Sequence, residues 1–254
     1  MRLPAGPLAL AHRGGAGLPA NAGIENSLAA IRNAVDLGYT YIETDVRASR
    51  DGVPFIVHDE DLRRITGDVR RVADLTAAEL RAATLTGGAA IPTLDEVLEE
   101  FGHLWLNLDM KSDDAVEPAI TTVRRHGMAE RVVVASFSTS RLAQVRRLAP
   151  EFATSASPLE VAAMLMGFSR SAVRNGAVAV QVPRRWRGKE MVTPAFIRRV
   201  HRQGMQVHVW TIDDAATIRL LLDRGVDAIV SDRVDVLRDV LVERGQWPAP
   251  TLGE

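Results

Sequence analysis

The sequence contains no cysteine, and this absence removes several kinds of chemistry at once. Disulfide bonds, thiolate nucleophiles and thiolate zinc sites are excluded. No apolar run approaches the length of a membrane span, so we expect no stable membrane insertion. The first segment, Met1 to Ala11, lacks the length of a signal peptide. We therefore expect a cytoplasmic protein.

An excess of charge of either sign is also missing. The 31 Lys and Arg residues nearly balance the 32 Asp and Glu residues, which leaves a net charge of −1. No overall field attracts the chain to nucleic acid or anionic lipid, so we expect no nucleic-acid partner. Its 254 residues, 46% hydrophobic and 25% charged, suit one large α/β barrel or two small domains.

Strand and helix patterns alternate along the chain, and the alternation favours a closed parallel (β/α)₈ barrel, or TIM barrel, formed by residues 1–254 as a single domain. A doubly wound open sheet shows the same alternation and is the alternative fold. The predicted strands begin near residues 8, 40, 104, 132, 152, 177, 206 and 227. The predicted helices span residues 27–38, 92–100, 113–126, 139–148, 159 onward, 194–203, 213–223 and 234–243.

Residues 59–91 interrupt this alternation after the second strand. An extra strand, Val53–Val57, precedes them, and a short helix is expected at Ala73–Ala83. The segment is too short to bury a hydrophobic core alone. We interpret it as an insertion in the barrel rather than as a separate domain.

The second strand, Tyr39–Val46, carries two carboxylates near its end. Glu43 and Asp45 are two residues apart, so their side chains point to the same face of the strand. Two neighbouring carboxylates repel each other, more strongly when buried, and a cation between them removes the repulsion. The alternative is an edge strand with a solvated acidic face.

In a parallel barrel the active site lies at the carboxyl ends of the strands, where this sequence places many polar residues. Gln181 and Trp210, at the ends of the sixth and seventh strands, are candidates for a substrate pocket, although Trp210 alone is also explained by core packing. The polar residues at the predicted strand ends are His12, Arg13, Glu43, Asp45, His58, Asp59, Asn107, Asp109, Lys111, Ser136, Gln181, Thr211, Ser231 and Asp232.

The carboxylates among them indicate a metal site. Glu43, Asp45 and Asp109, in a chain without cysteine, favour a hard divalent cation, Mg²⁺ or Ca²⁺, over zinc. The alternative for Asp109 is a local ion pair with Lys111, which is two residues away on the same face.

The basic side chains indicate a phosphate. Arg13 offers a fork of donors and Lys111 a compact positive charge. His12 and His58 can divide the work of general base and general acid near neutral pH. A lone histidine at a strand end is more often structural, so the hypothesis depends on these groups meeting at one end of the barrel. Together they indicate cleavage of a phosphoester.

The same residues resemble the glycerophosphodiester phosphodiesterase family over nearly the whole chain, from residue 9 to about 241. The resemblance rests on the motifs His12-Arg13-Gly14, Glu25-Asn26-Ser27, Glu43-Thr44-Asp45, Asp51-Gly52, His58-Asp59 with Leu62 and Arg64, Ile91 to Glu96, Asp109-Met110-Lys111, Ser136-Phe137, Trp210-Thr211 and Val230-Ser231-Asp232.

The resemblance implies a TIM barrel with a small insertion after the second strand. It also implies a small-molecule substrate, a glycerophosphodiester, which is hydrolysed to glycerol 3-phosphate and an alcohol. The implied roles are a divalent metal on Glu43, Asp45 and Asp109, acid and base at His12 and His58, and phosphate binding by Arg13 and Lys111.

Two positions depart from the family pattern. Asp109 stands where the family usually has Glu, so its carboxylate reaches less far toward a metal. Ile212-Asp213 replaces Val-Asn, a change expected to affect substrate detail. Two other functions remain open. One is a lysophospholipase D-like activity with an apolar groove lined by Met164, Leu165, Met166 and Phe168, although core packing of that helix explains these residues more readily. The other is a barrel that binds a phosphorylated ligand without turnover.

Overall fold

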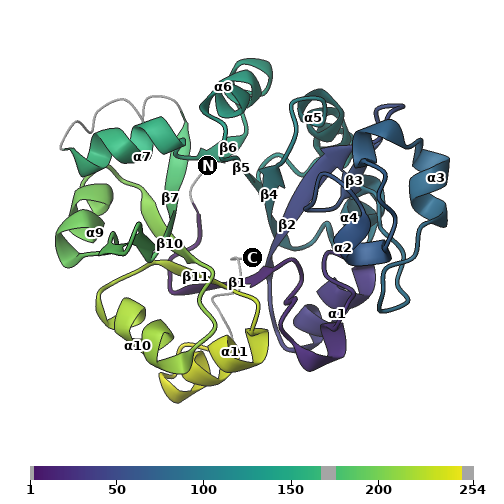
Figure 1. The fold of residues 1–254 in the computed structure, drawn as a ribbon. Coiled ribbons are helices and arrows are strands. Elements are labelled where there is room, and N and C mark those ends of the chain that lie inside the picture. Colours follow the sequence, from purple (N-terminus) through teal and green to yellow (C-terminus); the bar gives the residue numbers. More distant parts are fainter. Residues whose placement is uncertain (1–2, 167–175, 248–254) are drawn as a thin grey trace.

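The computed structural model describes residues 3–166 and 176–247, and in this part of the chain eight parallel strands form a closed barrel (Figure 1). The first strand pairs with both the second and the last, which closes the ring and excludes the open-sheet alternative. In chain order the barrel strands are β1 (Leu8–His12), β2 (Tyr41–Ala48), β4 (Trp105–Met110), β5 (Val132–Ala135), β6 (Ala153–Ser155), β7 (Ala177–Pro183), β10 (Gln206–Trp210) and β11 (Ala228–Ser231).

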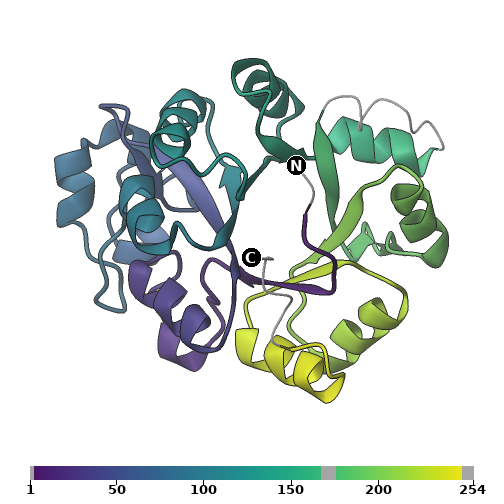
Figure 2. The same cartoon turned by 180° about the vertical axis from the view of Figure 1, so that it is seen from behind.

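Helices surround the ring of strands, as both views of the barrel show (Figures 1 and 2). Their starts follow from local chemistry, because side chains such as Ser27, Thr93 and Asp214 accept hydrogen bonds from the first turn of the helix. The helices outside the barrel are α1 (Leu28–Asp36), α4 (Leu94–Phe101), α5 (Val116–Arg125), α6 (Thr139–Leu148), α7 (Pro158–Leu165), α9 (Pro194–His201), α10 (Ala215–Asp223) and α11 (Val234–Glu243).

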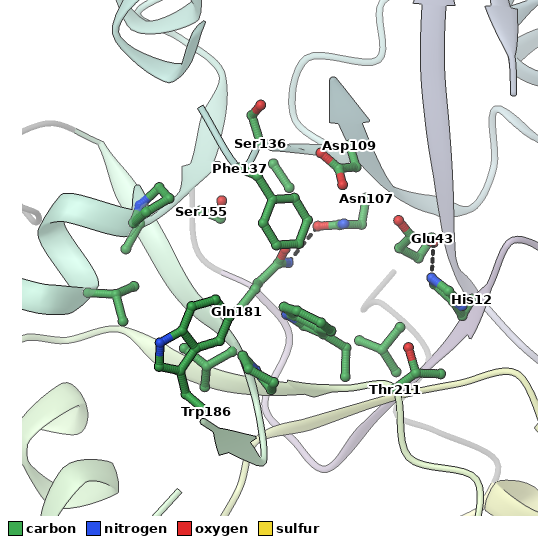
Figure 3. A pocket seen from close by; sticks show the side chains of 18 of the residues that line it. His12, Glu43, Asn107, Asp109, Ser136, Phe137, Ser155, Gln181, Trp186 and Thr211 are labelled. Carbon is green, nitrogen blue, oxygen red and sulfur yellow. Dashed lines mark hydrogen bonds and ion pairs between the residues drawn. The ribbon is translucent and has the colours of Figure 1, made fainter. Parts of the chain in front are cut away.

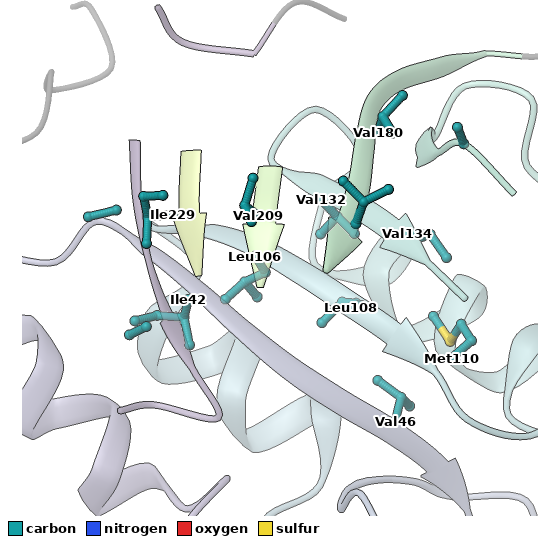
Figure 4. Close-up of a cluster of buried hydrophobic side chains, with 14 of the residues drawn as sticks. Ile42, Val46, Leu106, Leu108, Met110, Val132, Val134, Val180, Val209 and Ile229 are labelled. Carbon is teal, nitrogen blue, oxygen red and sulfur yellow. The ribbon is translucent and has the colours of Figure 1, made fainter. Parts of the chain in front are cut away.

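Alternation along the strands divides the core into two layers. Ile42, Leu106 and Leu108 belong to the layer between the strands and the helices (Figure 4). Tyr41 and Trp105 belong to a separate cluster that also contains Leu8 and residues from other barrel strands. The interior positions nearer the strand ends are therefore left for polar side chains.

The insertion adds a second hydrophobic cluster beside the barrel. The strand β3 (Pro54–Ile56) pairs antiparallel with β2, and the helices α2 (Arg63–Thr66) and α3 (Ala77–Ala82) follow it. Insertion residues such as Leu62 and Leu80 pack with Phe55 of β3 and with Ile24 and Ala30 from the first loop and helix. The insertion thus shares its core with the barrel.

Some predicted boundaries were wrong. The helix expected at Ala73–Ala83 is divided into a 3₁₀ turn, η2 (Val72–Asp74), and α3, because Leu75 is extended after the first piece and Thr76 caps the second through a capping box. The helix expected from residue 113 begins only at Val116.

Two further features complete the fold. A hairpin of two-residue strands, β8 (Arg185–Trp186) and β9 (Lys189–Glu190), was not predicted. Its turn residues, Arg187 and Gly188, both have positive φ, and only the glycine is a signal in the sequence. A short 3₁₀ turn, η1 (Pro19–Asn21), lies in the loop after β1. Within the described ranges, no helix is both long and apolar enough to cross a membrane.

Candidate active site

A cavity of about 440 Å³ opens at the carboxyl ends of the barrel strands, and Figure 3 shows the side chains around it. Asp45 is fully buried and is not part of the cavity wall. The structure therefore brings the predicted residues to one place although they come from strands far apart in the chain. Those that line the cavity are His12, Arg13, Glu43, His58, Asp109, Lys111, Gln181 and Trp210.

Three carboxylates form a compact cluster in this cavity. The parallel register of β2 and β4 places Asp45 beside Asp109 and Glu43 beside Asn107. One oxygen from each of Glu43, Asp45 and Asp109 lies within 4.8 Å of the others. All three residues are buried, so the alternative of a solvated acidic edge was wrong.

Burial makes it unfavourable for the carboxyl groups of this cluster to be ionised. Burial raises the pKa of the Glu43 carboxyl to about 7, and the nearby Asp45 charge contributes to the increase. Burial also raises the pKa of Asp109. For Asp45 burial acts in the same direction, but the charges of Lys111 and Arg13 outweigh it and hold its pKa below the ordinary value. The raised pKa values of Glu43 and Asp109 mean that their ionised forms are disfavoured here, and a cation between the carboxylates would relieve the repulsion.

The two predicted phosphate ligands contact the acidic cluster. Lys111 Nζ lies 3.0 Å from Asp45 Oδ1 and 2.6 Å from Asp109 Oδ2. Arg13 Nε lies 3.2 Å from Asp45 Oδ2, and Arg13 Nη1 donates to Glu25 at 3.0 Å. Both cations line the same cavity, within reach of a bound anion.

Asp109 therefore does make the ion pair with Lys111 that the sequence offered as its alternative role. The pair uses only one of its oxygens. Asp109 Oδ1 is buried and has no hydrogen-bond partner among the described residues. A buried carboxylate oxygen without a partner is costly, and a cation would satisfy it. All the donors are oxygens, so the residues fit Mg²⁺ or Ca²⁺.

The loop after β1 is held in an unusual conformation near the cluster. Arg13 and Asn26 have φ values of 52° and 60°, in a region that residues other than glycine rarely adopt. The backbone N–H of Asn26 donates to the Arg13 carbonyl at 2.9 Å, and its side-chain amide donates to Asp45 Oδ2 at 2.9 Å. The neighbouring Ser27, rather than Asn26, caps the helix that follows.

Each candidate histidine is hydrogen-bonded to a carboxylate through Nδ1. His12 Nδ1 lies 2.7 Å from Asp232 Oδ1, and His58 Nδ1 lies 2.7 Å from Asp59 Oδ1. His12 Nε2 lies 3.6 Å from Glu43, as the dashed line in Figure 3 shows. Burial acts to lower the pKa of His12, but the Glu43 and Asp232 carboxylates outweigh burial and raise it.

An ion-pair network connects the insertion to these residues. Arg64 Nε donates to Asp59 Oδ2 at 2.6 Å, and Arg64 Nη1 donates to Glu25 Oε2 at 2.6 Å. Glu25 in turn accepts from Arg13. The network therefore links Asp59, the partner of His58, to the candidate phosphate ligand Arg13. The sequence motifs include Glu25 and Arg64 but did not predict these contacts.

The opposite side of the cavity is apolar. Phe137 and Trp210 contact edge to face with their ring centroids 5.4 Å apart. Gln181, one of the polar groups among the lining residues, donates to Asn107 Oδ1 at 2.6 Å. The apolar lining comes mainly from α7 and from the hairpin region, through Pro158, Val161, Ala162, Leu165, Trp186 and Met191.

The four residues proposed for an apolar groove are only partly placed here. Leu165 lines the cavity. Met164 is buried in the core, and Met166 is 69% exposed but does not line the cavity. Phe168 lies outside the described residues. The apolar lining therefore uses Leu165 together with other residues of α7 and with the hairpin region.

Comparison with known proteins agrees with the geometry. The family model for the glycerophosphoryl diester phosphodiesterase family matches residues 12–236. A Mycobacterium tuberculosis protein named "Probable glycerophosphodiester phosphodiesterase 2" is 38% identical over 253 residues, which cover 95% of this chain and 93% of that protein. A glycerophosphodiester phosphodiesterase from Caldanaerobacter subterraneus subsp. tengcongensis is 29% identical, with 94% and 98% covered.

A solved structure leads to the same assignment. The crystal structure of glycerophosphodiester phosphodiesterase from Agrobacterium tumefaciens superimposes with a TM-score of 0.77 at 28% identity, and the match covers 92% of this chain and 99% of that one. The similarity thus extends over the barrel, the insertion and the cavity residues. This chain belongs to the glycerophosphoryl diester phosphodiesterase family.

Proposed function

We propose that this protein hydrolyses glycerophosphodiesters, which are small molecules, to glycerol 3-phosphate and an alcohol. Its class, phosphoric diester hydrolase, follows from its family. One observation supports the reaction most strongly. Two carboxylate-held histidines and a buried cluster of three carboxylates line or adjoin one cavity. Mere binding of a phosphorylated ligand requires no acid–base pair, so the alternative without turnover is disfavoured.

In this proposal Glu43, Asp45 and Asp109 hold a divalent cation, Mg²⁺ or Ca²⁺. When bound, the cation stabilises negative charge on a phosphoryl oxygen. Lys111 contacts Asp45 and Asp109 and also lines the cavity, so beside a bound cation its ammonium would be placed to contact the phosphate.

His12 and His58 transfer the protons. One takes a proton from the attacking water while the other donates a proton to the oxygen of the leaving alcohol. In each ring Nδ1 is engaged by a carboxylate, which leaves Nε2 for the substrate. Arg13, held by Glu25, provides donors for the phosphate oxygens.

The apolar side of the cavity supports a second candidate function, hydrolysis of lysophospholipids with release of the head-group alcohol. A deacylated glycerophosphodiester is polar and gains little from Val161, Ala162 or Leu165. An acyl chain placed against these residues leaves water, and each buried methylene contributes about 0.8 kcal/mol. Trp186 lies at this side of the cavity in Figure 3.

Release of choline distinguishes the two substrates with one assay. Glycerophosphocholine and lysophosphatidylcholine both contain choline, so their kcat/KM values can be compared directly. The proposed function predicts release from glycerophosphocholine, with glycerol 3-phosphate as the other product. Release from lysophosphatidylcholine alone identifies the second function instead. A folded, metal-supplied protein that releases choline from neither substrate contradicts both.

A further inference from the structure

The side chain of Asp232 makes a close contact with a candidate catalytic residue 220 positions away in the chain. Its Oδ1 lies 2.7 Å from His12 Nδ1. The register of β1 and β11 explains this contact. Ala11 pairs with Ser231, the last residue of β11, so the residues that follow them, His12 and Asp232, are adjacent. Asp232 does not line the cavity, so it acts on the ring rather than on a ligand.

The hydrogen bond determines which nitrogen of His12 faces the cavity. A carboxylate accepts a hydrogen bond from Nδ1–H, so the neutral ring carries its hydrogen on Nδ1 and Nε2 keeps its lone pair. His12 Nε2 is the atom nearer to Glu43, at 3.6 Å. The Asp232 bond thus fixes both the tautomer and the rotation of the ring.

A second carboxylate, Asp213, holds Asp232 in place. Asp213 Oδ1 accepts from the backbone N–H of Asp232 at 2.8 Å, from the Ser231 hydroxyl at 2.9 Å and from the Arg233 N–H at 3.2 Å. These three bonds organise the turn between β11 and α11. Asp213 does not line the cavity, so the expectation that this departure from the family pattern affects substrate contacts finds no support in the geometry.

The loop after β1 supports Asp232 from the other side. The Gly17 N–H donates to the Asp232 carbonyl at 2.9 Å. A Cβ on Gly17 would lie 3.0 Å from Asp232 Cβ, so the approach leaves little room for a side chain. Asp232 is therefore held by contacts from two loops and from its own turn.

We infer that Asp213 and Asp232 form a positioning chain that presents His12 Nε2 to the substrate. Asp213 fixes the turn, the turn fixes Asp232, and Asp232 fixes the tautomer and orientation of His12. The inference rests on the proposed role of His12 in proton transfer. It makes Asp232 and Asp213 determinants of kcat although neither contacts the substrate.

Steady-state kinetics with glycerophosphocholine test this chain through four variants. Asp232→Asn keeps the shape but loses the charged acceptor, and we expect kcat to fall about tenfold to a hundredfold with KM changed less than twofold. Asp213→Ala removes the acceptor of the turn and lowers kcat in the same way. Asp213→Asn keeps an acceptor oxygen at that position, so we expect its kcat to stay near the native value. The matched control is Asp235→Asn, since the Asp235 carboxylate pairs with Arg233 on the same turn and does not line the cavity.

A second measurement needs no turnover and so remains informative if the proposed function fails. Proton–nitrogen NMR of histidine-labelled protein, at alkaline pH where the ring is neutral, reports which nitrogen of His12 carries hydrogen. We expect Nδ1–H in the native protein and a shift toward Nε2–H in Asp232→Asn. The inference is overturned by Nε2–H in the native protein, by an unchanged tautomer in the variant, or by an unchanged kcat in folded Asp232→Asn.

Discussion

The two sides of the active-site cavity are held by different forces. On the polar side most charged groups have a charged partner: Arg13 contacts Asp45 and Glu25, and Lys111 contacts Asp45 and Asp109. On the apolar side large rings remain accessible, since Phe137 is 64% and Trp186 59% exposed. The polar side is thus organised before substrate arrives, whereas the apolar side has area still to bury. We therefore expect the polar side to control rate and the apolar side to control substrate choice.

Loss of either candidate catalytic histidine should have the largest effect on the polar side. We expect His12→Ala and His58→Ala each to lower kcat for glycerophosphocholine about 10²-fold or more, because general acid–base catalysis contributes this much. His126→Ala is the matched control, since His126 also pairs with a carboxylate, Asp95, but does not line the cavity. Near-native turnover by a folded His12 or His58 variant removes that residue from the mechanism.

The next largest effect should come from replacing the planar guanidinium group of Arg13 by an ammonium group. Arg13→Lys keeps the charge but loses the planar fork of donors, so we expect kcat/KM to fall about tenfold to a hundredfold. Arg32→Lys is the control, because Arg32 forms an exposed pair with Glu100. An Arg13→Lys protein with native kcat/KM indicates that Arg13 does not bind the phosphate.

A smaller effect is expected where the chain departs from its family. Asp is shorter than Glu by about 1.5 Å, and metal–oxygen distances tolerate only about ±0.2 Å. We expect Asp109→Asn to weaken the binding of Mg²⁺ or Ca²⁺ at least tenfold in calorimetric titration. Asp109→Glu should keep a working site. If Asp109→Asn binds metal as tightly as the native protein, the metal ligands reduce to Glu43 and Asp45.

The smallest effect should come from the apolar side. Trp186→Ala removes an exposed ring at the cavity wall, and partial loss of such a contact costs about 1 kcal/mol, or roughly fivefold in kcat/KM. We expect this loss for lysophosphatidylcholine and no change for glycerophosphocholine. Equal losses on both substrates contradict the division of the cavity into a rate-controlling and a substrate-choosing side.

The barrel and the polar side could be predicted because their signals are local. Every predicted strand start lies within about two residues of the observed start, from the first near residue 8 to the last near residue 227. Glu43 and Asp45 share a face because of strand periodicity alone, and closure of the barrel brings Asp109 beside them. Strand ends are therefore a sufficient guide to the acidic cluster.

The remaining features depend on contacts between distant parts of the chain. Nothing near His12 in the sequence identifies Asp232 as its partner, because only the closing pair of strands brings them together. The hairpin that carries Trp186 has strands of two residues, too short for a periodic signal. Of the three described residues suggested for an apolar groove, Leu165 lines the cavity, whereas Met164 and Met166 do not.

Metal dependence tests the central claim most directly, because the buried carboxylates are assigned to a hard cation. The measurement is choline release from glycerophosphocholine by protein treated with a chelator and then supplied with Mg²⁺, Ca²⁺ or Zn²⁺. We predict that chelation abolishes activity and that Mg²⁺ or Ca²⁺ restores it better than Zn²⁺, since every proposed protein ligand is an oxygen. Full activity in a verified metal-free preparation would contradict this account.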